Sequence, residues 1–431
     1  MSIKSSFLVC KQWQNVLQNF WKSTRVLDIT RKSPLNWGIP PRTLRERLTA
    51  PSLIRILKNC GEGLHTINSS DNSGLSYVII EKAGELCPNL ETVVLKSCSW
   101  PSLHIHKSLV ACKITQFAIN NAQDEAFLSN IFAQLNNLRY VEIHGNPTHC
   151  SIGSCILKLS KTIEVIRLSH IRISESIFNS AIQTLPNLRS LELNTCSNVN
   201  EDSFEKITYI NSLKYLKIHG FHLVNNLSSS LQLIKNLSNL EVLEITTMNK
   251  ESLRNISTVG IPAVACKFMW RDVNIFDDLF IEIAKNCRHL RSLDISGSSF
   301  VTDRGLNALA SYTNLERLII NYVPEVSDDC LAKFHSLKIL QCVGCEDVRD
   351  EGIIFLLQNA RELQVLDVSL TSIGDRTLEA AIDAVAKRHN NIPLKLALGF
   401  TATFLNYTPE YIEKIKPVSL EIIHETLMEI V

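Results

Sequence analysis

Apolar residues recur along this chain with the spacing L-x-x-L-x-L, which is clearest in the stretch from Leu290 to Ile320. Leu290, Leu293 and Ile295 form one copy, and the same spacing returns about 25 residues later. Alternate residues of a strand point to opposite faces, so this pattern predicts a short strand that buries Leu293 and Ile295 on one side.

After this strand the apolar period changes to that of a helix. Leu306, Leu309 and Ala310 have the spacing of one helical face. Asp303 suits the start of this helix, where a carboxylate accepts backbone N–H groups and meets the positive end of the helix dipole. One repeat is therefore a strand followed by a crossing helix, and only stacked copies can bury its apolar side.

The second apolar position of each copy recurs along most of the chain, at intervals mostly of about 22 to 27 residues. This long period predicts an α/β leucine-rich-repeat solenoid, a horseshoe of the ribonuclease-inhibitor type with a parallel inner sheet and outer helices. The expected positions are Ile67, Val93, Phe117, Val141, Ile166, Leu191, Leu216, Leu243, Cys266, Leu293, Leu318, Leu340, Leu366 and Leu396.

Both ends of the chain depart from the repeat. Residues 1–25 have helical spacing, and residues 26–66 read as a first repeat with an irregular, proline-containing insertion. The regular repeats span residues 67–399. Residues 400–431 predict a helical cap that closes the core at the C-terminal end.

The N-terminal segment contains Phe7-Leu8-Val9-Cys10-Lys11-Gln12-Trp13 and, further on, Trp21. It resembles the C-terminal half of an F-box, in which V-C-K-x-W precedes a helix and a second tryptophan. The Leu-Pro segment and amphipathic helix of the family would precede it, so we expect either a shortened sequence or a chain that has lost adaptor binding. A simple helical cap over the first repeat is the alternative.

Cysteines recur at fixed phases of the repeats. One set follows the strand leucines and the other ends the helices: Cys98, Cys196 and Cys345, then Cys60, Cys87 and Cys287. This pattern is similar to the cysteine-containing repeats of F-box/leucine-rich-repeat proteins. The resemblance implies a Skp-type adaptor, and through it a cullin, as partners of this chain. It points to Phe7, Leu8, Val9, Cys10, Trp13 and Trp21 as the adaptor-binding residues.

The net charge and the hydropathy of the chain limit the kinds of partner that we expect for it. The 44 basic and 43 acidic residues give a net charge of +1, so no overall field favours nucleic acid or an anionic membrane. There is no apolar stretch of transmembrane length, and the apolar run Phe7 to Cys10 is too short for a signal peptide. We therefore expect an intracellular protein, cytoplasmic or nuclear, whose 13 cysteines are reduced and whose partner is another protein.

No group of residues suggests catalysis, a metal or a cofactor. Cys342 and Cys345 have C-x-x-C spacing, but both fall on structural positions of the repeat, and no further pair of metal ligands lies nearby in sequence. A redox role for this pair is the alternative to the structural one. Four aspartates recur at one phase of the repeat and are expected to start helices: Asp303, Asp328, Asp350 and Asp375. We therefore expect a non-catalytic protein.

The residue between the second and third apolar positions should point to the open face of the sheet. Along the repeats these residues alternate in sign: Glu142, Arg167, Glu192, Lys217, Glu244, Lys267 and Asp294. Neighbouring strands lie about 4.8 Å apart, so we expect self-neutralising pairs worth about 0–1 kcal/mol each. Met269 and Trp270 interrupt this series of charged residues. They are interpreted either as exposed anchors for a partner or as side chains folded back over the junction between two repeats. The predicted target footprint is Lys267, Met269, Trp270, Asp294, Ile319, Gln341 and Asp367.

The resemblance to F-box/leucine-rich-repeat proteins implies that the chain is the substrate-recognition subunit of a Skp-cullin-F-box ubiquitin ligase, which binds a target protein on the solenoid. The alternative is a leucine-rich scaffold or inhibitor that works without the ligase.

Overall fold

The computed structural model describes residues 19–30, 48–69, 73–96, 109–122, 124–145, 153–196, 201–219, 236–246, 273–297, 301–311, 315–388, 390, 392–401 and 417–423. The chain divides into two compact units, Met1–Val199 and Asn200–Val431.

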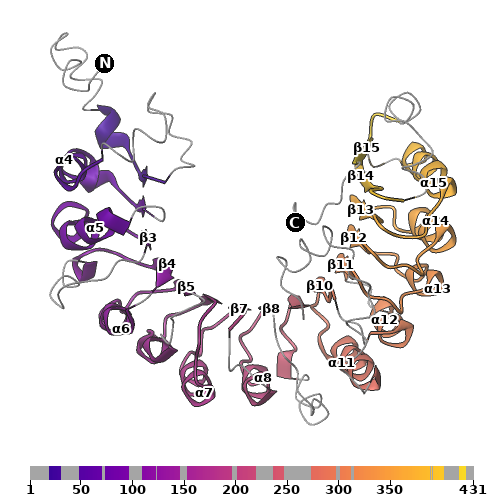
Figure 1. Cartoon of the computed structure of the whole chain (residues 1–431), viewed down its shortest axis with the longest axis horizontal. Coiled ribbons are helices and arrows are strands. Elements are labelled where there is room, and N and C mark those ends of the chain that lie inside the picture. Colours follow the sequence, from indigo (N-terminus) through magenta and orange to yellow (C-terminus); the bar gives the residue numbers. More distant parts are fainter. Residues whose placement is uncertain are drawn as a thin grey trace, which may run out of the picture. The chain divides into compact units, whose positions relative to one another are not determined.

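In the first unit, parallel strands follow one another in sequence order, and the helices lie along one side of them (Figure 1). The strands are β1 (Val26–Asp28), β2 (Thr66–Asn68), β3 (Thr92–Lys96), β4 (Gln116–Ala122), β5 (Tyr140–Gly145), β6 (Val165–Ser169) and β7 (Ser190–Asn194). The α-helices are α4 (Ala50–Cys60), α5 (Ser73–Leu86), α6 (Glu125–Phe132) and α7 (Glu175–Gln183). Short 3₁₀ helices are η1 (Gly61–Gly63), η3 (Leu109–Ala111) and η4 (Gly153–Lys158).

The second unit repeats this arrangement (Figure 1). Its strands are β8 (Tyr215–His219), β9 (Val242–Thr246), β10 (Ser292–Asp294), β11 (Arg317–Ile319), β12 (Ile339–Gln341), β13 (Val365–Asp367), β14 (Leu394–Ala397) and β15 (Leu420–Ile423). Its helices are α8 (Glu201–Thr208), α11 (Val273–Asn286), α12 (Asp303–Ala310), α13 (Asp328–Leu331), α14 (Asp350–Asn359) and α15 (Asp375–Ala386).

Strand register places the predicted apolar positions side by side. In the first unit Leu27, Ile67, Val93, Phe117, Val141, Ile166 and Leu191 are paired in turn. In the second unit the row runs through Leu216, Leu243, Leu293, Leu318, Leu340, Leu366 and Leu396. All of these side chains are buried, which confirms the predicted α/β leucine-rich-repeat solenoid with its parallel sheet.

Two expectations about the repeats are wrong. Strand β9 pairs directly with β10, with Leu243 opposite Leu293, so the row of strand residues passes from Leu243 to Leu293 without the expected position at Cys266, which lies outside the described residues. The helical cap predicted for residues 400–431 is contradicted at β15, which pairs in parallel with β14 and sets Ile422 beside Leu396. The alternation in Leu420-Glu421-Ile422 is that of one more repeat strand, with Leu420 and Ile422 buried and Glu421 exposed.

The four recurring aspartates begin α12, α13, α14 and α15, as predicted. The carboxylates of Asp303, Asp328 and Asp350, however, accept backbone N–H groups of the following repeat. Asp303 Oδ1 accepts the Ser327 N–H at 2.9 Å, Asp328 Oδ1 accepts the Arg349 N–H at 2.8 Å, and Asp350 Oδ1 accepts the Gly374 N–H at 2.9 Å. These aspartates therefore join consecutive repeats.

The glycine two residues after such an aspartate is required by close packing. A Cβ added to Gly352 would lie 2.6 Å from both the Cα and Oδ1 of Asp328 in the preceding repeat. The same substitution at Gly305 would bring Cβ within 2.6 Å of Asp277 Oδ1. In α12 and α14 the D-x-G sequence thus lets the start of the helix contact the preceding repeat.

Candidate functional site

The open face of the sheet, opposite the helices, carries a row of side chains set by the strand register. We call it the outward row. In the first unit Glu142, Arg167 and Glu192 are paired across β5, β6 and β7. In the second unit the row runs through Lys217, Glu244, Asp294, Ile319, Gln341 and Asp367. Because adjacent strands lie about 4.8 Å apart, each side chain can reach its neighbours.

In the first unit the outward row forms a connected polar cluster centred on Arg167. Its Nε lies 3.2 Å from Glu192 Oε2, its Nη1 donates to the Tyr140 hydroxyl at 3.2 Å, and its guanidinium lies 5.6 Å from the centre of the Tyr140 ring. Tyr140 in turn donates to Glu142, whose Oε1 lies 2.7 Å from His144 Nε2. The hydrogen bond from His144, together with that from Tyr140, lowers the pKa of Glu142 to about 2.

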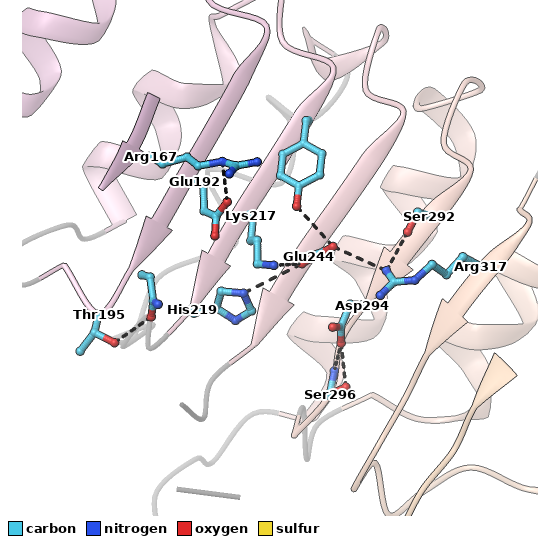
Figure 2. A network of polar contacts seen from close by, with 12 residues as sticks. Arg167, Glu192, Thr195, Lys217, His219, Glu244, Ser292, Asp294, Ser296 and Arg317 are labelled. Carbon is cyan, nitrogen blue, oxygen red and sulfur yellow. Dashed lines mark hydrogen bonds and ion pairs between the residues drawn. The ribbon is translucent and has the colours of Figure 1, made fainter. Parts of the chain in front are cut away.

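In the second unit the equivalent cluster surrounds Glu244. Lys217 Nζ lies 2.7 Å from Glu244 Oε2, and Arg317 Nη1 lies 3.5 Å from Oε1 (Figure 2). The Tyr215 hydroxyl donates to Oε1 at 3.4 Å, and His219 Nε2 lies 4.0 Å from Oε2. Burial opposes the ionisation of Glu244, but the hydrogen bond and charge of Lys217 with the charge of Arg317 outweigh it, so the pKa is lowered. The expected alternation of paired charges is thus found within each unit.

The pKa of Asp294, the next member of the row, is shifted in the opposite direction to that of Glu244. Its Oδ1 accepts the Ser296 N–H at 3.0 Å and the Ser296 hydroxyl at 2.7 Å (Figure 2). Burial raises the pKa of Asp294, and the negative charge of Glu244 adds to this effect. Asp367 repeats the turn contact, since its Oδ1 accepts the Ser369 N–H at 3.1 Å.

The expectation that four residues of the target footprint are exposed is wrong. Asp294, Ile319, Gln341 and Asp367 are 5%, 3%, 2% and 0% exposed. The three-residue strands β10–β13 lead at once into turns, and the two aspartates bind the N–H groups of those turns instead of extending into solvent. Target binding on this face stays a prediction. Lys267, Met269 and Trp270 lie outside the described residues.

Of the adaptor-binding candidates, only Trp21 lies among the described residues; Phe7, Leu8, Val9, Cys10 and Trp13 lie outside them. Trp21 is 6% exposed, and its ring lies edge-on to Phe20 with 5.6 Å between centroids. Trp21 therefore belongs to a packed core, whereas Phe20, its neighbour in the helical segment 19–23, is exposed.

Cys342 and Cys345 are free, fully buried thiols. Cys345 Sγ donates to the Ile320 carbonyl at 3.1 Å, and Cys342 Sγ donates to the Asp367 carbonyl at 3.6 Å. Burial raises the pKa of Cys345 to about 12 and that of Cys342 well above its usual value. Both thiols therefore support the structural interpretation. Among the described residues, no group of His, Cys, Asp and Glu has the arrangement of a metal site.

The residues on either side of the outward row in both polar clusters were not predicted from the sequence. Residues at i−2 and i+2 on a strand share the face of residue i, which gives Tyr140, Glu142 and His144 on β5 and Tyr215, Lys217 and His219 on β8. The strands read Y-V-E-I-H and Y-L-K-I-H, so comparing the repeats two residues to either side of the outward row would have found both sets.

The comparisons with known proteins agree with this architecture. No family model matches the chain. F-box/LRR-repeat protein 17 of Arabidopsis thaliana is 24% identical to it over 367 residues, which are 84% of this chain and 48% of the relative. The chain thus spans about half the length of this curated relative. The resemblance to F-box/leucine-rich-repeat proteins that the sequence suggested is confirmed.

A solved structure that spans nearly the whole chain has a similar fold. The Rad7 and Elc1 complex of yeast contains a chain that is 14% identical to this one, with a TM-score of 0.50 and coverage of 99% of this chain and 98% of that chain. An internalin of Listeria monocytogenes is 18% identical, with a TM-score of 0.45 over 77% of this chain and 85% of its own. Within the described parts of the chain, no helix combines the length and apolarity that crossing a bilayer requires.

Proposed function

We propose that this leucine-rich-repeat chain, with its resemblance to F-box/leucine-rich-repeat proteins, is the substrate-recognition subunit of a Skp-cullin-F-box ubiquitin ligase. The observation that carries the proposal is the similarity to an F-box/LRR-repeat protein over 84% of the chain. The N-terminal sequence F-L-V-C-K-Q-W supports it. In this role the chain performs no covalent chemistry and contributes proximity, because it holds a target near enzymes supplied by other subunits.

Within this proposal the two parts of the chain have separate tasks. Residues 1–25 bind the Skp-type adaptor, with Trp13 as the central anchor because Trp21 is buried. The open face of the repeats binds the target. Arg167, whose side chain is 44% exposed, is the most accessible charged member of the outward row, and Lys267, Met269 and Trp270 remain proposed contacts.

A pull-down of the full chain with a purified Skp-type adaptor tests the first task. We expect the wild-type chain to retain the adaptor and Trp13→Ala to reduce retention at least tenfold. Phe355→Ala is the matched control, because this aromatic side chain on α14 is 55% exposed and far in sequence from the N-terminal segment. Circular dichroism of each variant establishes that it is folded.

A third protein, with a Leu-Pro segment and an amphipathic helix added before Met1, completes the test. Retention by this form alone would support an F-box that needs the added elements. Failure of both forms to bind the adaptor would contradict the ligase proposal and favour the ligase-independent scaffold or inhibitor.

A further inference from the structure

In the second unit a left-handed residue follows the strand at the same position of successive repeats. The residues with positive φ are Gly297 (75°), Tyr322 (58°), Gly344 (71°), Leu370 (57°) and Phe400 (59°). Each lies four residues after the buried leucine of its strand. At Tyr322, Gly344 and Phe400 the next residue donates its N–H to the carbonyl three residues back, at 3.2 Å in each case. These are turns whose third position is normally glycine.

Tyr322, Leu370 and Phe400 place large side chains where two of the repeats use glycine. A non-glycine residue in this conformation is strained, and strain of this kind persists where another requirement outweighs it. Burial is not that requirement at two of the positions, because Leu370 is 37% and Phe400 is 70% exposed. Tyr322 is partly buried, and a Cβ on Gly344 would lie 2.6 Å from its ring.

Backbone hydrogen bonds hold these turns in a stack. The Tyr322 N–H donates to the Val343 carbonyl at 2.7 Å, the Gly344 N–H to Ser369 at 3.0 Å, and the Leu370 N–H to Gly399 at 2.9 Å. Successive turns therefore lie one strand spacing apart along the ends of β11 to β14, which Figure 1 shows as consecutive strands. The side chains of Tyr322, Leu370 and Phe400 belong to one edge of the unit. We call these three residues the apolar ridge.

The loops that follow the turns of Tyr322, Gly344 and Leu370 carry more acidic than basic side chains. The loop residues 320–327, 342–349 and 368–374 carry three carboxylates, Glu325, Glu346 and Asp347, against one cation, Arg349. All three carboxylates are on exposed residues, and none has an ion-pair partner among the residues that the structure describes. The loops are stacked like the turns, because the Ser372 hydroxyl donates to the Glu346 carbonyl at 2.6 Å. The described loops stacked beside the apolar ridge thus carry a net negative charge.

We propose that the apolar ridge and the carboxylates of Glu325, Glu346 and Asp347 bind a short segment of a target protein in which an aliphatic or aromatic side chain lies next to lysine or arginine. Charge complementarity selects this occupant, since a basic segment neutralises the rim and an acidic one is repelled by it. The exposed ring of Phe400 supplies the kind of aromatic anchor that dominates interfaces. This proposal rests on the proposed function, because it names the chemistry of the target.

A displayed library of random 12-residue peptides, selected on the full chain, tests the proposal. We expect the selected peptides to be enriched in an apolar residue adjacent to Lys or Arg. A synthetic peptide of the selected sequence should lose at least tenfold in affinity for Phe400→Gly or Leu370→Gly. The double variant Glu346→Lys/Asp347→Lys should lose a similar factor, and Phe355→Ala should lose none.

The glycine variants separate binding from folding. Glycine relieves the positive φ, so Phe400→Gly and Leu370→Gly should unfold at an unchanged or higher temperature while they lose the peptide. Failure to select any peptide, selection of acidic peptides, or equal affinity for the glycine variants would overturn the proposal. Adaptor retention is measured on the same variants. Peptide binding without adaptor retention by either the wild-type chain or the form extended before Met1 would contradict the ligase role and leave this surface in place.

Discussion

Lys217 Nζ lies 2.7 Å from Glu244 Oε2 across the neighbouring strands β8 and β9. The pair joins adjacent repeats on the open face, and both side chains are largely buried. Breaking a buried pair by removing one partner is costly, and here Glu244 would lose its nearest cation and keep only the more distant Arg317, at 3.5 Å, and His219, at 4.0 Å. We expect Lys217→Met to lower the free energy of unfolding by about 2–4 kcal/mol at pH 7, measured by urea denaturation. Lys387→Met, at an exposed pair on α15, should change it by less than about 1 kcal/mol.

Glu142 should make stability depend on pH in a defined window. Its pKa is about 2 in the folded chain, well below the usual glutamate value of 4.5. The stabilisation is therefore fully present above the unfolded pKa and is lost as the pH falls from about 4.5 towards 2. We expect Glu142→Gln to cost on the order of 1–2 kcal/mol at pH 7, after allowance for solvent screening. The difference from wild type should shrink below pH 4.5; a constant difference down to pH 3 would contradict this assignment.

Asp294 should behave in the opposite way. Its raised pKa means that the folded state binds the proton more tightly than the unfolded state, so the cost of its charge grows as the pH rises through the unfolded and folded pKa values. Asp294→Asn keeps an oxygen that can accept the two hydrogen bonds from Ser296. We expect this variant to match or exceed the stability of the wild-type chain at pH 7, by up to about 1 kcal/mol. A loss of 2 kcal/mol or more in thermal or urea unfolding would show that the ionised carboxylate is required.

The D-x-G contact between repeats predicts an unusual response to alanine. Replacing a helical glycine by alanine ordinarily stabilises a helix by up to about 1 kcal/mol. Gly352→Ala should instead destabilise the chain by about 1–3 kcal/mol, because its Cβ would lie 2.6 Å from the Asp328 backbone. Glu379→Ala, at an exposed position of α15, is the control and should be nearly neutral. Equal melting temperatures for Gly352→Ala and the wild-type chain would refute the packing argument.

Much of the fold follows from the sequence because the strand leucines are both periodic and buried. Within the first unit, from Ile67 to Leu191, and within the second, at Leu216, at Leu243 and from Leu293 to Leu396, the predicted apolar positions lie in the expected row. The period failed at Cys266, because a run of apolar residues at the right interval does not establish pairing. It also failed at β15, whose short Leu-Glu-Ile pattern was read as part of a helical tail.

The open face was less predictable than the core. Charge alternation correctly predicted the ion pairs of Arg167 and Lys217. It did not predict the burial of Asp294 and Asp367, since that depends on turn N–H groups two residues later. The positive φ angles of Leu370 and Phe400 could not be predicted from the sequence either, because their residue types give no sign of a left-handed conformation.

The most direct measurement for the central claim is a calorimetric titration of the full wild-type chain, and of the form extended before Met1, with a purified Skp-type adaptor. The ligase account predicts saturable 1:1 binding by at least one of these forms and loss of at least tenfold in affinity on Trp13→Ala, with unchanged binding for Phe355→Ala. No heat of binding from either form, at concentrations where both are folded, would contradict the account.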